Sequence, residues 1–122
     1  MNRGSITIIG DHVSVRFVNG TVWLSQHQIA TLFNVVVGKI RSNIRSIINS
    51  DQLRERDVCY NYRFDGGSVD LYNLEMILTL AFRVGSPNAK RLRQWAISRI
   101  TTKHRDNKAI YLQFNQNNNI VN

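Results

Sequence analysis

The chain has 122 residues, a length typical of one domain, and its hydrophobic content of 43% is sufficient for a packed core. Sixteen Lys and Arg against eight Asp and Glu give a formal charge of +8, which favours a polyanionic partner, most often nucleic acid. No apolar run approaches the ~20 residues that span a bilayer, and the N-terminal stretch MNRGSITIIG lacks a signal-peptide core, so we expect no membrane partner.

The N-terminal part of the chain predicts β-strands and a tight turn. Ile6–Ile9 and Val13–Val18 have strand composition, and the second segment alternates between two faces. Asn19-Gly20 is a strong signal for a two-residue hairpin turn. We expect this turn to return the chain through Thr21–Trp23 and so to form an N-terminal β-hairpin.

The segment Leu24–Asn49 predicts two short helices joined by a tight turn. Ser25 and Gln28 have the spacing of a capping box. Asn34 suits the turn because Asn tolerates positive φ. The second helix, from about Val36, has an apolar stripe that comprises Val36, Ile40, Ile44, Ile47 and Ile48. Polar or small residues lie opposite or on the flanks, namely Gly38, Lys39, Arg41, Ser42, Arg45, Ser46 and Asn49.

The polar side of this second helix has two interpretations. A helix with Arg, Lys, Asn and Ser on its free side suits the major groove of DNA. Any surface helix has a polar side, however, so the pattern alone leaves DNA reading and a plain solvated face about equally open. The run Val35–Val37 lacks a capping side chain and is a poor helix start, which counts against a helix-turn-helix.

Val58–Leu71 predicts a second β-hairpin around a glycine-rich turn. Such a hairpin suits the place of a wing beside a helix-turn-helix, in which Tyr60, Tyr62 and Arg63 would contact the phosphate backbone. The alternative is that the aromatic side chains belong to the core, and strand composition favours it by about two to one.

Two further helices are expected in the C-terminal half. Asn73 is a suitable N-cap for the first, whose buried stripe comprises Leu74, Ile77, Leu78, Ala81 and Phe82. Ser86 and Pro87 suit the start of the second. Its inward side comprises Ala89, Leu92, Trp95, Ala96 and Ile100, and its outward side Lys90, Arg91, Arg93 and Gln94. Arg99 lies within the apolar arc and either reaches the surface or pairs with a carboxylate such as Glu75.

The last residues differ in composition from the rest. Residues 105–122 are polar and rich in Asn and Gln, which predicts a disordered tail after a domain at residues 1–104. Within the tail, Ala109–Phe114 has the composition of a stray strand.

No set of residues predicts catalysis or a metal site. The histidines His12, His27 and His104 share no metal-ligand spacing with each other or with Cys59. The single cysteine fits a reducing compartment and is more typical of a buried structural thiol than of a nucleophile. We therefore expect no enzyme, no catalytic residues, no metal and no cofactor. A nuclease site of two scattered carboxylates stays as an alternative, at roughly one in ten.

Two blocks of the sequence resemble the RhuM family, often labelled virulence protein RhuM. Thr21–Val35 (TVWLSQHQIATLFNV) is similar to the run T-V-W-L-[ST]-x-x-x-[IM]-A-x-L-F-x-V of that family. Val69–Ala96 is similar to its later run, with matches at Tyr72, Asn73, Leu74, Ile77, Phe82, Arg83, Val84, Ser86, Arg93, Trp95 and Ala96. The later helices are also similar to phage antirepressor N-terminal domains of the BRO and KilA type. The resemblance covers about Val15–Thr102, most of the chain.

The resemblance implies a DNA-binding protein of pathogenicity islands, prophages and conjugative elements, located in the bacterial cytoplasm at the nucleoid. One departure concerns the second helix, which begins D-R-S-x-I in the family but Val36–Ile40 here, so base contacts are not carried over to Val37 or Gly38. A second is length, since many relatives continue into a longer C-terminal region. The chain is therefore either a short stand-alone member or part of a longer protein.

Residue pattern and resemblance predict the same fold and function. The fold is α+β, a winged helix-turn-helix-like domain with an N-terminal β-hairpin, a second β-hairpin and two C-terminal helices. The function is sequence-specific binding of double-stranded DNA in transcription regulation, with a homodimer expected because short readers often use two half-sites. The alternative is an antirepressor-like module that binds a repressor protein rather than DNA, and RNA binding through stacked tyrosines ranks third.

The predicted DNA contacts fall into two groups. Base contacts are expected from the free side of the second helix, at Arg41, Ser42, Arg45 and Asn49. Arg41 and Arg45 are the best candidates for guanine, because guanidinium matches O6 and N7 bidentately. Phosphate contacts, which position without reading sequence, are expected at Ser25, Gln26, Lys39, Lys90, Arg91 and Arg93.

Overall fold

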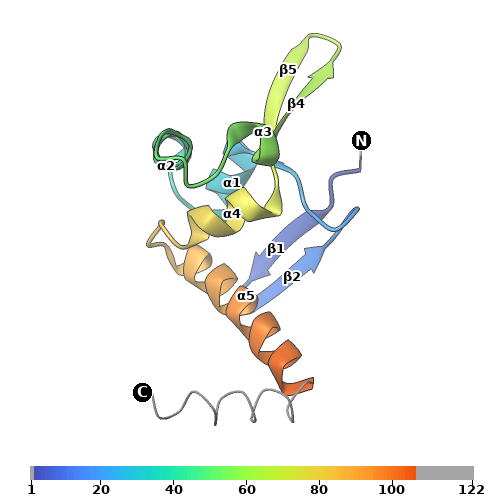
Figure 1. Ribbon diagram of the computed structural model, residues 1–122, viewed down its shortest axis with the longest axis vertical. Coiled ribbons are helices and arrows are strands. Elements are labelled where there is room, and N and C mark those ends of the chain that lie inside the picture. Colours follow the sequence, from blue (N-terminus) through green and yellow to red (C-terminus); the bar gives the residue numbers. More distant parts are fainter. Residues whose placement is uncertain (1, 107–122) are drawn as a thin grey trace.

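The computed structural model describes residues 2–106 and has an α+β architecture, which confirms the predicted fold class (Figure 1). The described part has a two-stranded sheet, a three-stranded sheet and five helices. The elements in chain order are β1 (Ser5–Ile9), β2 (His12–Arg16), β3 (Leu24–Ser25), α1 (Gln26–Phe33), α2 (Val37–Asn49), α3 (Glu55–Val58), β4 (Cys59–Phe64), β5 (Gly67–Tyr72), α4 (Leu74–Ala81) and α5 (Pro87–Asp106).

The N-terminal hairpin is present, but its turn lies earlier than predicted. β1 and β2 pair antiparallel up to Ile9 and His12, around a turn in which Gly10 has φ 58°. A glycine at the first central position suits a two-residue hairpin loop, so Gly10-Asp11 is a signal that the prediction missed. Around Asn19-Gly20 the chain forms an isolated antiparallel β-bridge between Val18 and Thr21 instead of a hairpin. The Trp23 N–H then donates to the carbonyl of Arg3 at 2.9 Å.

The start and end of α1 confirm the predicted local signals. The Ser25 hydroxyl accepts a hydrogen bond from the Gln28 N–H at 3.2 Å, and the Gln28 Oε1 accepts one from the Ser25 N–H at 2.9 Å. Asn34 ends the helix with φ 57° in the left-handed region. The capping box sets where α1 begins, and the left-handed turn residue sets where it stops before α2.

α2 begins one residue later than predicted. Val36 is its N-cap, has an extended backbone and no side-chain cap, and is 75% exposed. The prediction that Val36 belongs to the buried stripe is therefore wrong, because the residue precedes the first helical turn. The rest of the stripe is confirmed for the buried Ile40, Ile44 and Ile47, while Ile48 is half-buried.

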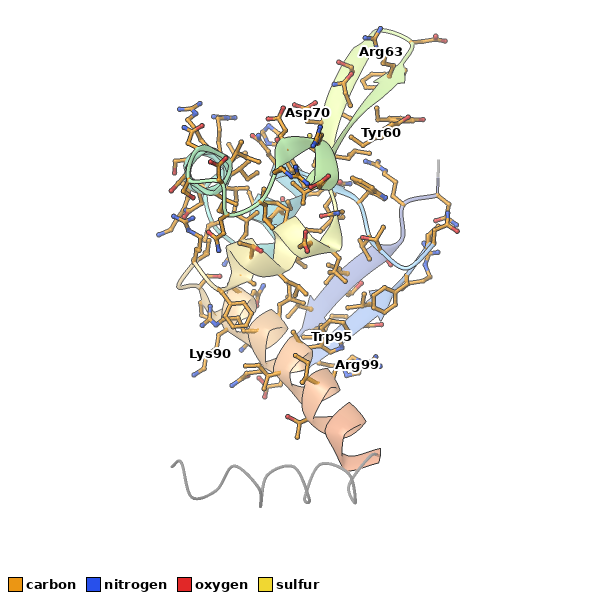
Figure 2. All side chains as sticks on the ribbon, viewed as in Figure 1. Tyr60, Arg63, Asp70, Lys90, Trp95 and Arg99 are labelled. Atoms are coloured by element: carbon orange, nitrogen blue, oxygen red, sulfur yellow. The ribbon has the colours of Figure 1, made fainter. Side chains whose placement is uncertain are left out.

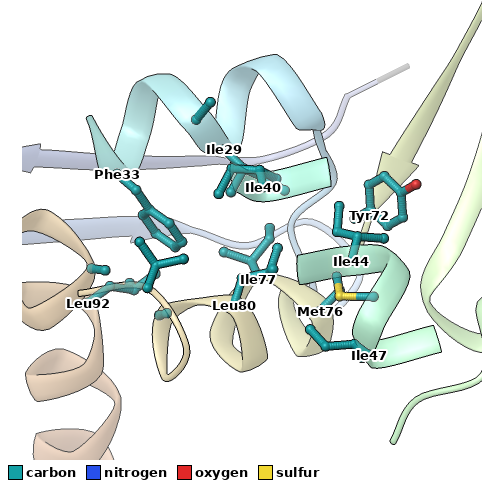
Figure 3. Close-up of a cluster of buried hydrophobic side chains, with 14 of the residues drawn as sticks. Ile29, Phe33, Ile40, Ile44, Ile47, Tyr72, Met76, Ile77, Leu80 and Leu92 are labelled. Atoms are coloured by element: carbon teal, nitrogen blue, oxygen red, sulfur yellow. The ribbon is translucent and has the colours of Figure 1, made fainter. Parts of the chain in front are cut away.

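One core lies between α1, α2, α4 and α5 (Figure 3). Phe33 at the end of α1 is fully buried and lies near Leu92 of α5. In α4 the predicted burial of Ile77 and Ala81 is confirmed, and that of Phe82 is wrong. Phe82 is the C-cap residue and is 57% exposed, while Met76 and Leu80 are buried within the helix, and Leu74 and Leu78 are half-buried.

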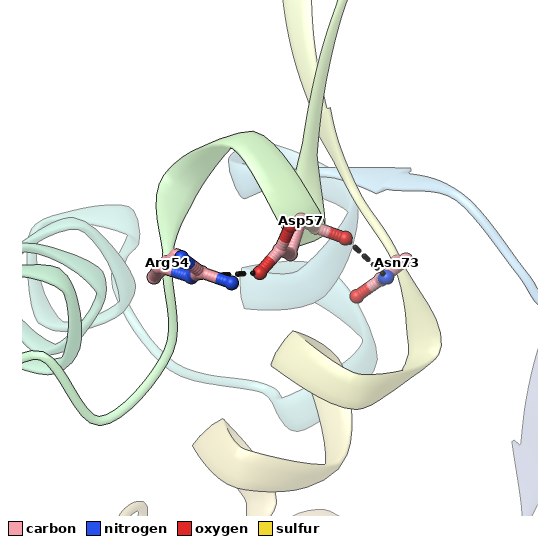
Figure 4. A network of polar contacts seen from close by, with 3 residues as sticks. All are labelled: Arg54, Asp57 and Asn73. Carbon is pink, nitrogen blue, oxygen red and sulfur yellow. Dashed lines mark hydrogen bonds and ion pairs between the residues drawn. The ribbon is translucent and has the colours of Figure 1, made fainter.

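A short helix that the sequence did not predict, α3, leads into the second hairpin. The predicted cap of α4 is confirmed, since Asn73 Oδ1 accepts a bond from the Met76 N–H at 3.2 Å. The amide of Asn73 also donates to the carbonyl of Asp57 at 3.2 Å, and Arg54 pairs with the Asp57 carboxylate (Figure 4). The bond from Asn73 to the Asp57 carbonyl joins α3 to the start of α4, and the Arg54–Asp57 pair lies within the first turn of α3.

The second hairpin projects away from the helices (Figure 1). β4 and β5 pair from Cys59 and Tyr72 outward, and β3 pairs with the inner end of β5. The interpretation of the hairpin aromatics as core is wrong at Tyr60 and Phe64, which are 48% and 52% exposed. Their strand segment extends beyond the helices, so no core covers them.

α5 begins as predicted and runs past the body of the fold. Ser86 Oγ accepts a bond from the Ala89 N–H at 3.1 Å, in the manner of an N-cap. Of the predicted inward side chains, Ala89 and Leu92 are buried and Trp95 and Ala96 half-buried, whereas the inward prediction is wrong for Ile100, which is 58% exposed.

The end of the described chain adds two findings. Arg99 is exposed, with its guanidinium 5.2 Å from the centre of the Trp95 ring, so it does reach the surface. α5 continues to Asp106, past the predicted domain end at residue 104. The predicted tail from residue 107 on, with the stray strand Ala109–Phe114, lies outside the described residues. Between residues 2 and 106, no helix combines the length and apolar character needed to cross a membrane.

Candidate nucleic-acid interface

The outer side of α2 is positively charged and open to solvent. Lys39, Arg41 and Arg45 are exposed, and the helix contains no carboxylate. In the described part of the chain the ion pairs are Arg54–Asp57 and Arg91–Asp11, both at 3.2 Å, so neither involves α2. The three cations therefore keep their charge available to an external anion.

The predicted base-contact residues of α2 differ in how far they are already engaged. Ser42 and Asn49 are exposed, but the Ser42 hydroxyl donates to the Lys39 carbonyl at 3.2 Å. Asn43 donates to the same carbonyl at 2.8 Å. Asn49 and Arg45 make no side-chain hydrogen bond within the described residues, which leaves both for a ligand.

Arg41 is linked to two other elements. Its Nε donates to Gln26 Oε1 at 3.3 Å, and the Gln26 Nε2 donates to the Tyr72 hydroxyl at 3.4 Å. Both ends of the Gln26 amide are thus used within the protein, although Gln26 was predicted as a phosphate contact. The chain of bonds joins the first residue of α1 to α2 and to the inner end of β5.

A shallow pocket of about 260 Å³ lies between α2, α3 and β5. It brings together three predicted base-contact residues, Arg41, Arg45 and Asn49, while Ser42 does not line it. The remaining lining residues are Gln26, Ile44, Ile48, Glu55 and Tyr72. The helix pattern could not have predicted Glu55 and Tyr72 here, because they come from other elements.

The β4–β5 hairpin has a polar face, with Asn61, Arg63 and Asp70, and an aromatic face on the opposite side, with Tyr60, Tyr62 and Phe64. The labels of Figure 2 place Asp70 and Tyr60 on different sides of the hairpin and Arg63 near its tip. Asn61 on the polar face donates to the Asp70 carboxylate at 2.8 Å. The base of this face therefore carries a carboxylate, and its positive charge lies toward the tip.

Several predicted phosphate-contact residues are already used by the fold. Ser25 is buried, and its hydroxyl caps α1. The prediction that Arg93 faces outward is wrong, because it is half-buried and donates to the carbonyls of Ala81 and Val84. The last carbonyls of a helix lack intrahelical donors, which explains this inward position at the end of α4.

The other two predicted phosphate contacts on α5, Arg91 and Lys90, differ from each other. Arg91 is half-buried, pairs with the exposed Asp11 carboxylate and donates to Asn88 Oδ1 at 2.8 Å, so its guanidinium is already engaged at the surface. Lys90 is exposed, as predicted. Of the three α5 residues predicted to bind phosphate, only Lys90 makes no side-chain hydrogen bond or ion pair within the described residues.

Arg83 is a candidate that the sequence interpretation missed. It is exposed and donates to Ser46 Oγ of α2 at 2.9 Å and to Gln52 Oε1 at 3.5 Å. It therefore adds positive charge beside α2, next to Ser46. No local pattern indicated this position, because Arg83 and Ser46 are 37 residues apart in the chain.

Burial changes the acidity of two neighbouring groups on the inner end of the hairpin. It raises the pKa of Tyr72 from 10.0 to about 12. Burial, with the nearby Asp70 charge, also raises the pKa of Cys59, which disfavours the thiolate that a nucleophile needs. Among residues 2–106 no group of three His, Cys, Asp or Glu side chains is arranged to hold a metal ion.

The raised pKa of Tyr72 predicts a loss of stability at alkaline pH. The folded state keeps a proton that the unfolded chain loses above its pKa of 10.0, so this contribution is complete below pH 10 and is lost as the pH rises from 10 through the folded-state pKa of about 12. A shift of this size corresponds to about 2–3 kcal/mol.

Urea unfolding at a series of pH values checks this prediction. The wild type should lose about 2–3 kcal/mol more than Tyr72→Phe over this pH interval. Tyr62→Phe, on the same hairpin, should decline like the wild type. Parallel curves for the wild type and Tyr72→Phe would contradict the assignment.

Comparison of the chain with protein-family models, curated proteins and solved structures finds no match. The RhuM resemblance therefore stays a prediction from its two sequence blocks.

Proposed function

We propose that this protein binds double-stranded DNA in a sequence-specific manner and regulates transcription. The observation that carries the proposal is the outer side of α2, where Lys39, Arg41 and Arg45 are exposed on a helix without a carboxylate. Ile40, Ile44 and Ile47 hold the opposite side in the core and so fix which side faces outward. A formal charge of +8 supports a polyanionic partner.

The dimensions of α2 suit the major groove. Its 13 residues correspond to about 20 Å of helix, and a helix with its side chains is about 10–12 Å across. The major groove is about 12 Å wide and accepts such an element. In this arrangement α1 precedes the reading helix and the β4–β5 hairpin serves as a wing, with Arg63 toward the neighbouring phosphates.

The roles of the side chains follow from their contacts in the free protein. Arg41 and Arg45 read bases, with Asn49 and Ser42 making lesser contacts. Lys39 and Arg83 lie on the flank of α2 and bind phosphate, as does the exposed Lys90. Ser25, Arg91 and Arg93 are left out of the DNA contacts, because Ser25 is buried, Arg93 is half-buried against the end of α4, and the charge of Arg91 is paired with Asp11.

The same proposal extends to the setting of the protein. The RhuM resemblance supports a regulator carried on a mobile element or prophage, acting at the nucleoid in the bacterial cytoplasm. A homodimer on two half-sites would supply the affinity that one short helix lacks.

Selection of bound duplexes from a random pool tests the proposal. We expect one motif to be enriched, with guanine at the positions that the α2 arginines contact. Absence of any enriched motif, together with salt-resistant binding to a repressor protein, would overturn DNA reading in favour of the antirepressor function. Phosphate-driven affinity, in contrast, falls steeply with salt.

Arg45→Ala is expected to relax specificity at one position of the selected motif. Loss of a bidentate guanine contact should cost about 1–3 kcal/mol of binding free energy on the selected site. The matched control Lys90→Ala, which removes a phosphate contact, should weaken all sequences alike. Competition binding with selected and scrambled duplexes measures both. Equal loss on the two duplexes for Arg45→Ala would remove it from base reading.

A further inference from the structure

We infer that Gln26 and Tyr72 are positioning residues that hold Arg41 for reading one guanine, although neither contacts the duplex. The inference rests on the proposed function and adds a specificity mechanism to it. It assigns to Gln26 a role different from the phosphate contact predicted from the sequence.

The contacts form a continuous chain from a buried ring to an exposed charge. Tyr72 is 5% exposed and lies in β5, where it pairs with Leu24 and Cys59 of the neighbouring strands. Gln26 is half-buried and receives its place from the capping box that begins α1. Arg41 is exposed on α2. Each side chain is therefore bonded to one that is more deeply buried, Arg41 to Gln26 and Gln26 to Tyr72.

The atoms used in this chain leave the reading end of Arg41 available. Guanidinium has five N–H donors in a fixed plane, and the bond to Gln26 Oε1 takes only the Nε donor. Holding Nε fixes the plane of the group, while the two terminal nitrogens remain for the paired acceptors O6 and N7 of guanine. Ordering a long side chain before binding reduces the entropy lost on binding.

The side chain that accepts the bond from Arg41 also affects how much positive charge Arg41 offers to DNA. Gln26 is neutral, so it orients Arg41 without neutralising its charge. The Glu55 carboxylate lines the same pocket but forms no ion pair with Arg41 in the described structure. Arg45, on the same pocket, has no side-chain hydrogen bond in the described residues, and so provides an internal comparison.

The test replaces each guanine of the selected duplex, one at a time, with 7-deazaguanine, which lacks the N7 acceptor. One position should depend on Arg41, with a loss of about 5- to 150-fold in wild-type affinity and none in Arg41→Ala. Tyr72→Phe and Gln26→Ala should reduce the sensitivity at that position severalfold and leave affinity for scrambled duplex unchanged. Tyr62→Phe, a hairpin tyrosine outside the chain of contacts, should match the wild type.

Two further variants separate positioning from general stability. In an Arg41→Ala background, Tyr72→Phe should have no additional effect on binding, whereas a structural defect would add to the loss. Gln26→Glu keeps an acceptor for Arg41, so it should preserve the guanine sensitivity while its charge lowers affinity for all duplexes. Thermal unfolding of each variant establishes that it is folded at the binding temperature.

The outcomes distinguish the two proposals. If Tyr72→Phe and Gln26→Ala keep wild-type sensitivity at the Arg41 position, or weaken all duplexes alike, positioning is refuted and DNA reading stands. If no duplex is selected by the wild type, the proposed function itself fails, and the positioning role fails with it.

Discussion

Phe33→Ala is expected to lower the free energy of unfolding by about 3–5 kcal/mol. Phe33 is fully buried at the end of α1 in the core shared by α1, α2, α4 and α5. Removal of its ring takes away apolar contacts and leaves a cavity that rigid neighbours fill only in part. A domain of this kind has about 5–15 kcal/mol of stability, so the variant should be near the limit of folding.

Urea unfolding followed by circular dichroism measures this loss. Phe82→Ala is the matched control, because the same ring is removed from a residue that is 57% exposed. It should change stability by no more than about 0.5 kcal/mol. A cost below about 1 kcal/mol for Phe33→Ala would mean that α1 does not pack into the core as described.

The double variant Lys39→Gln with Arg83→Gln, which removes two phosphate contacts beside α2, should bind DNA about two orders of magnitude more weakly at ~50 mM salt. Each neutralised DNA contact changes the slope of log affinity against log salt by about 0.9, so two contacts lower its magnitude by about 1.8. Arg41 is left in place, so this prediction does not depend on how that residue is held.

A salt titration on mixed-sequence duplex measures the slope. The matched control is Arg16→Gln with Arg99→Gln, which removes the same charge from two exposed residues on β2 and α5. The control should lose little affinity and keep nearly the wild-type slope. Similar losses for both double variants would indicate a diffuse effect of net charge instead of an interface on α2.

Features that depend on near neighbours in the chain were predictable from sequence. The Ser25 and Gln28 cap, the Asn34 turn and the isoleucine stripe of α2 all follow from spacings of three or four residues. The N-terminal turn at Gly10 also has a local signal, but Asn19-Gly20 carries a stronger one and so predicts a later turn.

Features that depend on distant contacts were not predictable. Arg93 faces inward because the end of α4 offers carbonyls, which the pattern of α5 alone does not reveal. The candidate site shows the same division. Arg41, Arg45 and Asn49 share one side of one helix, whereas Tyr72 reaches Gln26 across 46 residues of sequence.

The outer part of the β4–β5 hairpin has a consequence for how such proteins diverge. In the described chain the hairpin gives Leu71 and Tyr72 to the buried core, and residues 60–70 give none. Insertions, deletions or replacements near Asp65-Gly66 should therefore be tolerated by folding. Changes of length and sequence in this protrusion can therefore accumulate while the helical body stays unchanged, so that evolutionary novelty and structural integrity reside in separate parts of one small protein.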